Sequence, residues 1–271
     1  MRINQNVMAN NAFRNLSTTN VSLGKSLEKL SSGFRINRAA DDAAGLVISQ
    51  NLRAQTSGLR QATRNAQDGI SVVQTAEGAL NEVHTILNRM RDLSVQAANT
   101  GANDDAARAA ALAEITALTA EVVRISDNTS FGGTRLLDGT YTAQQFQIGA
   151  NSGQVLTVTI ADMGSTVVAP APPALLTAAA AATAITNYDA AIAAVSVQRG
   201  SLGAVQNQLE SMINNLQVTT ENLVASESRI RDTDMAAEMT NFTKNQILSQ
   251  AGTAMLAQAN QVPQSILSLL R

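Results

Sequence analysis

Cysteine and tryptophan are both absent from the 271 residues, and aromatic side chains of all kinds make up only 3%. Without cysteine the chain can form neither disulfide bonds nor thiolate metal sites. Alanine, leucine, isoleucine and valine supply most of the 45% hydrophobic content. This composition favours long, closely packed helices over a globular core built on aromatic rings.

Catalytic groups are also scarce. The one histidine, His84, falls on the polar side of a predicted helix, where a lone imidazole is more often solvated than catalytic. No Ser-His-Asp set can be assigned around it, no HExxH motif occurs, and Gly132-Gly133 is not followed by the Lys-Ser/Thr pair of a phosphate-binding loop. We therefore expect no enzymatic activity, no cofactor and no metal.

Long uninterrupted hydrophobic runs are missing too. The opening MRINQNVMANNAFRNL lacks the apolar segment of a cleavable signal peptide. The apolar stretch 167–182 contains Pro170, Pro172 and Pro173, so it is too short and too broken to span a bilayer. We expect no membrane insertion.

Charge is unevenly distributed along the chain. Residues 1–66 hold nine basic and three acidic side chains, a net charge of +6, so the remainder carries −8. One interpretation is nucleic-acid binding by the basic end. The other, which we favour, is that the two ends pack together, because no basic cluster is dense and no aromatic residue is interleaved with it. We expect no nucleic-acid partner.

The C-terminal stretch is apolar and nearly uncharged, which is unusual for a chain end. Between Met239 and Leu270 the only charged residue is Lys244. A helical stripe with spacings of three and four contains Leu248, Ala251, Met255, Ala259, Val262, Ile266 and Leu269. Such a helix gains most of its stability from packing, so the stripe predicts a partner surface.

The N-terminal segment 1–34 is predicted to be a second charge-poor helix. One heptad seam contains Phe13, Leu16, Leu23, Leu27, Leu30 and Phe34, with Asn20 at the remaining position. The segments that follow this helix (33–45) and precede the C-terminal one (229–238) are charged connectors. We expect ion pairs there, rather than paired catalytic carboxylates, among Arg35, Arg38, Asp41, Asp42, Arg229, Arg231, Asp232 and Asp234.

Between the connectors the pattern predicts three more helices, at about 46–99, 103–127 and 187–231. Alternating apolar residues predict one β-hairpin at about 142–160, and FGGTRLLDG (131–139) has the composition of a turn. Residues 163–186 are rich in proline and then alanine, and we interpret them as a loop. The predicted fold is mainly α, with long antiparallel coiled-coil helices from both chain ends and one small β-hairpin insert.

Several long segments of this sequence follow the pattern of one known family. They are INQNV (3–7), 27–49, 67–69, 75–99, 131–139, 146–151, 202–216 and 228–271. Through these segments the sequence resembles the bacterial flagellins, the subunits of the flagellar filament. The resemblance covers nearly everything except about 163–186.

The resemblance implies an inner-tube coiled-coil domain (1–40 with 235–271), an outer-tube domain (41–162 with 187–234) and a truncated variable loop (163–186). It implies a structural subunit of the flagellar filament for swimming motility. It also implies export unfolded through the flagellar type III pathway to an extracellular location. The partners implied are other flagellin copies, an export chaperone, and cap and junction proteins.

Three surfaces are candidate functional sites. The self-assembly surface is expected at Leu16, Leu23, Leu27, Leu30, Phe34, Met255, Val262, Ile266 and Leu269. By resemblance, Arg89, Leu93 and Glu114 match a segment recognised by a Toll-like innate immune receptor, although Met90, Asp92 and Ser94 depart from the usual residues. A chaperone and immune-sensor site is implied at Leu267, Leu269, Leu270 and Arg271.

Two alternatives stay open. One is a hook-associated junction protein of the same family, which shares the terminal helices. The other is a secreted membrane-active translocator, which the Gln, Asn, Ser and Thr content of the terminal helix disfavours, because interfacial helices carry Lys and Arg on their polar face.

Overall fold

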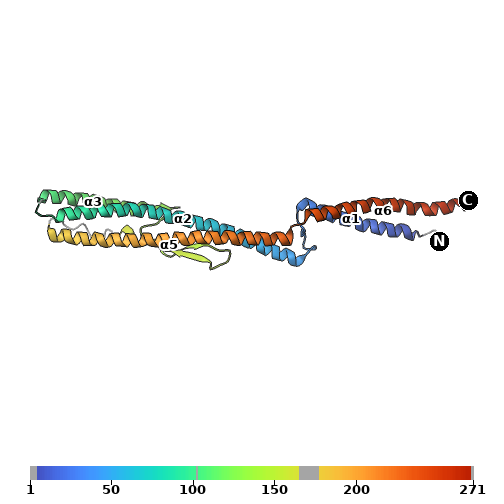
Figure 1. Cartoon of the computed structure of the whole chain (residues 1–271), viewed down its shortest axis with the longest axis horizontal. Helices are drawn as coiled ribbons and strands as arrows, with labels where there is room; N and C mark the ends of the chain where they lie inside the picture. The colour runs from blue at the N-terminus through green and yellow to red at the C-terminus, as the bar shows by residue number, and fades with distance from the viewer. Residues whose placement is uncertain (1–4, 102, 165–176, 270–271) are drawn as a thin grey trace. The chain divides into compact units, whose positions relative to one another are not determined.

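The computed structural model describes residues 5–101, 103–164 and 177–269, with the backbone alone for 262–269. It is mainly helical, as the sequence predicts (Figure 1). The long helices are α1 (Val7–Ser32), α2 (Ala43–Ala98), α3 (Asp105–Asn128), α5 (Ala178–Arg231) and α6 (Met235–Leu269).

The chain divides into two compact units. One unit contains residues 1–55 and 221–271, and the other contains residues 56–220. The sequence analysis places the boundaries between its two domains at 40/41 and 234/235. The boundaries between the two compact units lie within the long helices, so α2 and α5 each contribute residues to both units.

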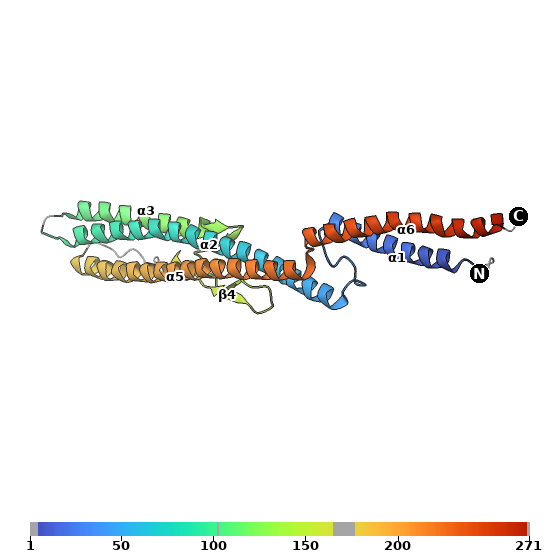
Figure 2. The ribbon, with the colours of Figure 1, turned by 45° about the vertical axis from the view of Figure 1, so that its right-hand side comes forward.

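In the unit of residues 56–220, α2, α3 and α5 lie side by side, as the two views of Figures 1 and 2 agree. Buried apolar residues recur at heptad spacing along α2 and along α5, which is the pattern of long helices that pack lengthwise. Fully buried residues at this spacing are Val73, Leu80 and Leu87 on α2, and Val195, Leu202 and Leu209 on α5. Each such leucine contributes about 1.5–3 kcal/mol through burial.

A small β-hairpin covers part of this bundle, as predicted. Strand β3 (Gln144–Gln147) pairs antiparallel with β4 (Val155–Val158), and Phe146 lies opposite Leu156. Phe146 and Leu156 both pack against the core of the bundle. The alternation of apolar and polar residues along both strands explains why one face of the hairpin is buried.

The sequence analysis expected one hairpin, and the described residues contain two. Strands β1 (Ser130–Phe131) and β2 (Thr134–Arg135) form a second, very short one. Its two turn residues, Gly132 and Gly133, have φ angles of 58° and 86°. Consecutive positive φ angles define the tight turns that join adjacent strands, and glycine adopts them without steric cost.

The interpretation of residues 163–186 as a loop is wrong for its last third. Helix α5 begins at Ala178, nine residues before the expected start at Asn187, and residues 165–176 lie outside the described part of the chain. Alanine has the highest helix propensity, and Ala181 and Ala184 are fully buried in the bundle core. The alanine run is therefore a packed helix end.

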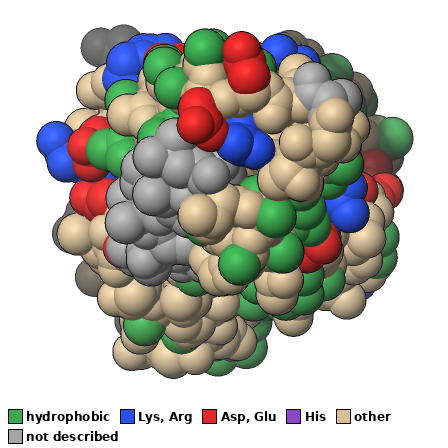
Figure 3. Space-filling view, turned by 90° about the vertical axis from the view of Figure 1, so that its left-hand side faces the viewer, with side chains coloured by type: hydrophobic (Ala, Val, Ile, Leu, Met, Phe, Trp, Pro, Cys, Tyr) green, Lys and Arg blue, Asp and Glu red, His purple; other side chains and the backbone are tan. Residues whose placement is uncertain are grey.

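Charged side chains are dispersed over the surface seen in Figure 3, where acidic and basic groups lie interspersed. That face shows no broad basic area of the kind that binds nucleic acid. Within the described ranges, no helix combines the length and the hydropathy required to cross a bilayer.

The bundle core allows a direct test. Leu87→Ala removes a side chain with no exposed surface, and we expect it to lower the free energy of unfolding by about 2–5 kcal/mol. Val197→Ala, which changes a side chain that is 73% exposed, serves as the control and should change stability by about 0.5 kcal/mol or less. Thermal unfolding followed by circular dichroism gives both values, and equal effects would contradict the assigned core.

Candidate functional site

The charged connector 33–45 begins where α1 ends at a glycine. Gly33 has a left-handed conformation with φ 74°, and its backbone N–H donates to the carbonyl of Lys29 at 2.8 Å. This conformation closes the last helical turn and redirects the chain, which is the usual role of glycine at a helix C-terminus.

Immediately after this turn, the two connectors are joined through their backbones. Phe34 and Asp232 form an isolated antiparallel bridge. The Arg35 N–H donates to the Arg231 carbonyl at 2.7 Å, and the Thr233 N–H donates to the Gly33 carbonyl at 3.0 Å. These bonds connect positions about 200 residues apart in the sequence, so they fix where the chain leaves and re-enters the terminal helices.

The acidic residues of the connectors bind backbone N–H groups instead of arginines. Asp41 accepts hydrogen bonds from the N–H groups of Arg38 (3.0 Å) and Asn37 (3.2 Å). Asp42 accepts from Gly45 at 2.8 Å and thereby caps the start of α2. The expected ion pairs of these two aspartates are therefore wrong, because Asp41 binds backbone N–H groups of its own connector and Asp42 caps α2.

Asp234 acts in the same way at the start of α6, where it accepts from Ala236 at 2.9 Å and Ala237 at 3.1 Å. Asp232 takes part in the junction through its backbone bridge to Phe34. No ion pair joins Asp232 or Asp234 to a connector arginine within the described residues.

The connector arginines have other partners than expected. Arg38 pairs with Glu28 at 2.9 Å, and the guanidinium of Arg35 donates to the carbonyl of Ile230. Arg231 stacks over the Phe34 ring at 4.4 Å from its centroid. Arg229 donates to the Ser226 hydroxyl at 3.0 Å. Of the four arginines, Arg38 is thus the one in an ion pair, and its partner lies in α1.

Beyond the junction, α1 and α6 run antiparallel as a helix pair. Their facing sides are half-buried to buried and carry both small residues and leucines at heptad spacing. The α1 side contains Ala9, Ala12, Leu16, Thr19, Leu23, Ser26 and Leu30, and the α6 side contains Glu238, Phe242, Asn245, Ser249, Gly252, Leu256 and Ala259. Small side chains allow the two backbones to approach closely.

Specific contacts cross this seam. A Cβ at Gly252 would lie 3.2 Å from Leu16 Cδ1, so the α6 backbone approaches Leu16 closely. The Ser249 hydroxyl donates to Asn20 Oδ1 at 2.9 Å, and Asn6 Nδ2 donates to the Ala259 carbonyl at 2.7 Å. Lys29 lies 3.9 Å from Glu238 at the junction end.

The predicted assembly residues therefore fall on two different faces. Leu16, Leu23, Leu30 and Phe34 are half-buried, whereas Leu27 is 58% and Met255 63% exposed. Because the real seam on α1 follows Ala9, Ala12, Leu16, Thr19, Leu23, Ser26 and Leu30, Phe13 and Leu27 lie outside it. The side chains of Val262, Ile266, Leu267, Leu269, Leu270 and Arg271 lie outside the described part of the chain.

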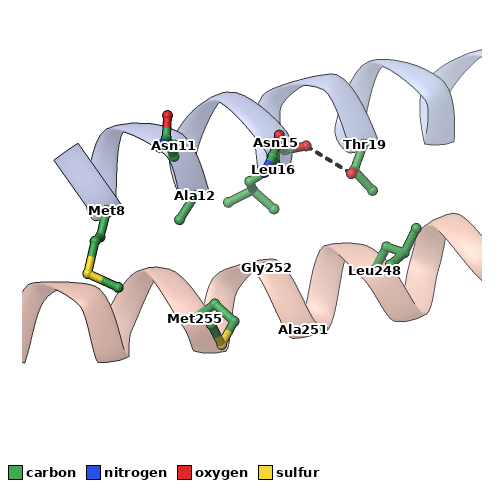
Figure 4. Close-up of a pocket in the computed structure, with 10 residues that line it drawn as sticks. All are labelled: Met8, Asn11, Ala12, Asn15, Leu16, Thr19, Leu248, Ala251, Gly252 and Met255. Carbon is green, nitrogen blue, oxygen red and sulfur yellow. Dashed lines mark hydrogen bonds between the residues drawn. The ribbon is translucent and has the colours of Figure 1, made fainter.

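An apolar groove lies along one flank of the helix pair (Figure 4). Its volume is about 430 Å³, and no charged residue lines it. The lining residues are Met8, Asn11, Ala12, Asn15, Leu16 and Thr19 of α1 and Leu248, Ala251, Gly252 and Met255 of α6. Part of the apolar stripe predicted for the C-terminal helix thus forms a wall of this groove instead of the intramolecular seam.

Several exposed apolar residues lie outside the predicted self-assembly set. On α1 and α6 they are Val7, Met8, Phe13, Val21, Met235, Met239 and Ile247. Helices α1 and α6 contain more apolar residues than one two-helix seam can bury. The helix pair consequently leaves apolar surface in contact with water.

The receptor-recognition candidates lie in the other unit. Arg89 of α2 and Glu114 of α3 are exposed and form an ion pair at 2.7 Å. Leu93 is 3% exposed and belongs to the bundle core. Of the three residues that match the receptor-recognised segment, Leu93 is therefore not accessible at the surface, because α2 turns this position toward its neighbours in the bundle.

No cluster of metal-ligating side chains occurs among the residues that the structure describes. His84 is half-buried and not fully exposed on the polar side of α2. Its Nδ1 has no hydrogen-bond partner among the described residues. The helix pair with its apolar groove is therefore the candidate functional site.

The comparisons with known proteins agree with this architecture. Residues 3–142 match the bacterial flagellin N-terminal helical region, and residues 185–270 match the bacterial flagellin C-terminal helical region. The chain belongs to the bacterial flagellin family. Together the two matched regions include both terminal helices and both connectors of this family member.

Full-length relatives support the assignment. The chain is 52% identical to a flagellin of Bacillus subtilis and 53% identical to one of Halalkalibacterium halodurans, with complete coverage of both chains in each case. It is 47% identical to a flagellar filament 33 kDa core protein of Treponema phagedenis, again over the full length of both.

Among solved structures, the crystal structure of Bacillus cereus flagellin is similar with a TM-score of 0.52 and 33% identity. The similarity covers 56% of this chain and 88% of that one. A flagellar hook-associated protein from Vibrio parahaemolyticus has a TM-score of 0.59 at 16% identity, over 71% of this chain and 100% of that one. At such low identity the second similarity shows the shared fold alone.

The hydrogen bonds that Asp41 accepts from the connector backbone make the connector sensitive to acid. Hydrogen bonds from the N–H groups of Arg38 and Asn37 hold the pKa of the Asp41 carboxyl below its ordinary value. A lowered folded pKa contributes stability that is complete above the ordinary value of about 3.9 and is lost as pH falls through the folded pKa. We expect ¹³C NMR titration to give an Asp41 pKa below about 3.9, with the connector loosening as it titrates.

Asp41→Asn provides the control for this prediction. It keeps a side-chain oxygen at the same place but has no titrating carboxyl. The acid-dependent loosening of residues 37–41 should therefore disappear in the variant. An Asp41 pKa at or above the ordinary aspartate value would contradict the role of its carboxylate as acceptor of these two hydrogen bonds.

Proposed function

We propose that this chain is a structural subunit that polymerises into the bacterial flagellar filament and thereby serves swimming motility. The observation that carries the proposal is the apolar, nearly uncharged outer surface of the α1–α6 pair, including its groove. Exposed apolar surface of this kind marks protein–protein contact. The bacterial relatives named flagellin and flagellar filament core protein support the same assembly.

Repeated copies of the same chain are the partner that fits this surface. The surface is lined by Met, Leu, Ala, Asn and Thr, and α1 and α6 carry the same side-chain types, so one copy can cover another. Contacts between unlike patches that repeat without closing produce helical fibres. In the proposed filament, the terminal helices of each copy are buried by those of its neighbours.

The location that accompanies this function is extracellular. We propose that the chain is exported unfolded through the flagellar type III pathway, that an export chaperone covers its C-terminal segment around Leu267–Arg271, and that cap and junction proteins contact the finished filament. An apolar helix is a suitable ligand for a chaperone groove.

A hook-associated junction protein is the alternative within the same fold. Such a protein would share the terminal helix pair but would not polymerise alone into long filaments. A membrane-active translocator would need a cationic interfacial helix, and α6 has Lys244 as its one basic residue between Met235 and Gln261.

Polymerisation is tested by seeding the purified chain with short filament fragments and viewing it by electron microscopy. We expect long filaments from the unmodified chain. The double variant Leu248→Asn with Met255→Gln makes the groove polar and should raise the critical concentration at least about tenfold, while helix content is retained. Val197→Asn, a polar change at an exposed apolar residue of the other unit, is the matched control.

Three outcomes separate the possibilities. Long filaments that depend on the groove support the filament subunit. Leakage of liposomes without filaments would indicate the translocator. Short or capped assemblies, which form only with other flagellar proteins, would indicate the junction protein.

A second candidate function is recognition by a Toll-like innate immune receptor, which the exposed Arg89–Glu114 pair favours. The guanidinium of Arg89 binds Glu114 through Nε and Nη2 and is 55% exposed, and a guanidinium can form two parallel bonds to a carboxylate. We propose recognition through these two charged residues, with Leu93 acting indirectly by supporting the helix on which Arg89 lies.

Arg89→Ala should weaken receptor binding by the monomer about tenfold, the effect of losing one central contact. Arg91→Ala is the control, because Arg91 lies one half-turn away and pairs with Asp189 instead. Leu93→Ala should lower thermal stability, since its side chain is in the core. Equal binding by the Arg89 and Arg91 variants would contradict this recognition mode.

A further inference from the structure

Methionine is the only sulfur-containing residue type in this chain, because cysteine is absent. Its methionines fall into clearly different environments. Met8 and Met255 are 66% and 63% exposed, whereas Met90 and Met163 are 1% and 2% exposed. Solvent-exposed thioethers react with peroxides far more readily than buried ones.

The two most exposed of these methionines lie at the same structural feature. Met8 of α1 and Met255 of α6 both line the apolar groove. Figure 4 shows the Met8 side chain extending toward α6 at the end of the groove where Met255 lies. The groove therefore presents two thioethers to solvent in the free chain.

From this placement we infer that Met8 and Met255 are sites of sulfoxidation in the free subunit and that their oxidation opposes assembly. In the reaction the thioether sulfur attacks the distal oxygen of a peroxide, and one S–O bond forms as the O–O bond breaks. Sulfur loses two electrons to become a sulfoxide, and hydrogen peroxide is reduced to water. No other reactant is required.

The consequence for assembly follows from the polarity of the product. A sulfoxide is a strong hydrogen-bond acceptor. The α6 wall of the groove beside Met255 is Leu, Ala and Gly, whereas the α1 wall also contains Asn11, Asn15 and Thr19. Water solvates the sulfoxide while the groove is open, so the fold of the single chain is unaffected. Covering the groove with another copy would strip that water from an oxygen that the unoxidised, apolar thioether does not carry, and burial of this polar group costs free energy. This step rests on the proposed polymerisation.

Two further methionines, Met235 and Met239, supply an internal comparison. They are 48% and 50% exposed on α6 but do not line the groove. Oxidation should reach them as well, although their sulfoxides would not lie in the groove. In these four methionines the rate of oxidation depends on how exposed the sulfur is, whereas the effect on assembly depends on whether the side chain lies in the groove.

The experiment treats the full-length monomer with hydrogen peroxide and maps each sulfoxide by peptide mass spectrometry over time. We expect Met8 and Met255 to oxidise at least about tenfold faster than Met90 and Met163, since buried thioethers are reached only through opening of the fold. Circular dichroism should be unchanged. Equal rates for the exposed and buried residues would overturn the site assignment.

The effect on assembly is measured as the rise in critical concentration that peroxide causes in each variant. The unmodified chain should show a rise of at least about tenfold. That rise should be reversed by methionine sulfoxide reductases acting on both epimers. The double variant Met8→Leu with Met255→Leu should show little rise, whereas Met235→Leu with Met239→Leu should keep it. A rise retained in the first variant or lost in the second would overturn the assignment to the groove.

Failure of the proposed function is distinguishable in the same experiment. A chain that does not polymerise before peroxide is added would contradict the filament subunit and the effect on assembly together. The mass-spectrometric rates do not depend on polymerisation, so selective oxidation of Met8 and Met255 would still support them as the modification sites.

Discussion

The close packing of α1 against α6 is the contact on which the rest of this unit depends. Each helix turns one narrow row of small residues and leucines toward the other, and Gly252 lets the α6 backbone approach Leu16. The small residues of this row add little to the stability of the single chain, because burial energy scales with apolar area. The larger residues Phe13, Leu27, Leu248 and Met255 are left outside, where they can be covered by something other than the chain itself.

The helices were the most predictable part of the structure. Heptad periodicity located α1, α2, α3, α5 and α6 because long amphipathic segments repeat their signal many times. The hairpin β3–β4 was predictable from its alternation. The alanine run that begins α5 was the segment whose structure the sequence did not predict. It has no hydrophobic periodicity, and an alanine-rich composition fits a loop and a packed helix equally well.

The site was less predictable than the fold. Sequence spacing identified an apolar seam on each terminal helix, but a seam that shifts by one position changes which leucines are buried. Leu16 and Leu23 face α6, while Leu27 does not. Nearby opposite charges in the connectors similarly suggested ion pairs, yet Asp41, Asp42 and Asp234 bind backbone N–H groups. Unpaired N–H groups at helix starts compete with arginine for the same carboxylates, and sequence alone does not rank the two.

The two polar bonds within the α1–α6 pair have a consequence for its alignment. The seam mixes alanine, serine, glycine and threonine with leucine and phenylalanine, so each register of the two helices brings different side chains together. The bonds from Ser249 to Asn20 and from Asn6 to the Ala259 carbonyl do not survive a slide of one helix by a heptad. Polar contacts with fixed partners of this kind favour one register over others. In this molecule the two hydrogen bonds fix the alignment of α1 and α6, so that Met8 lies opposite the same stretch of α6 in every copy.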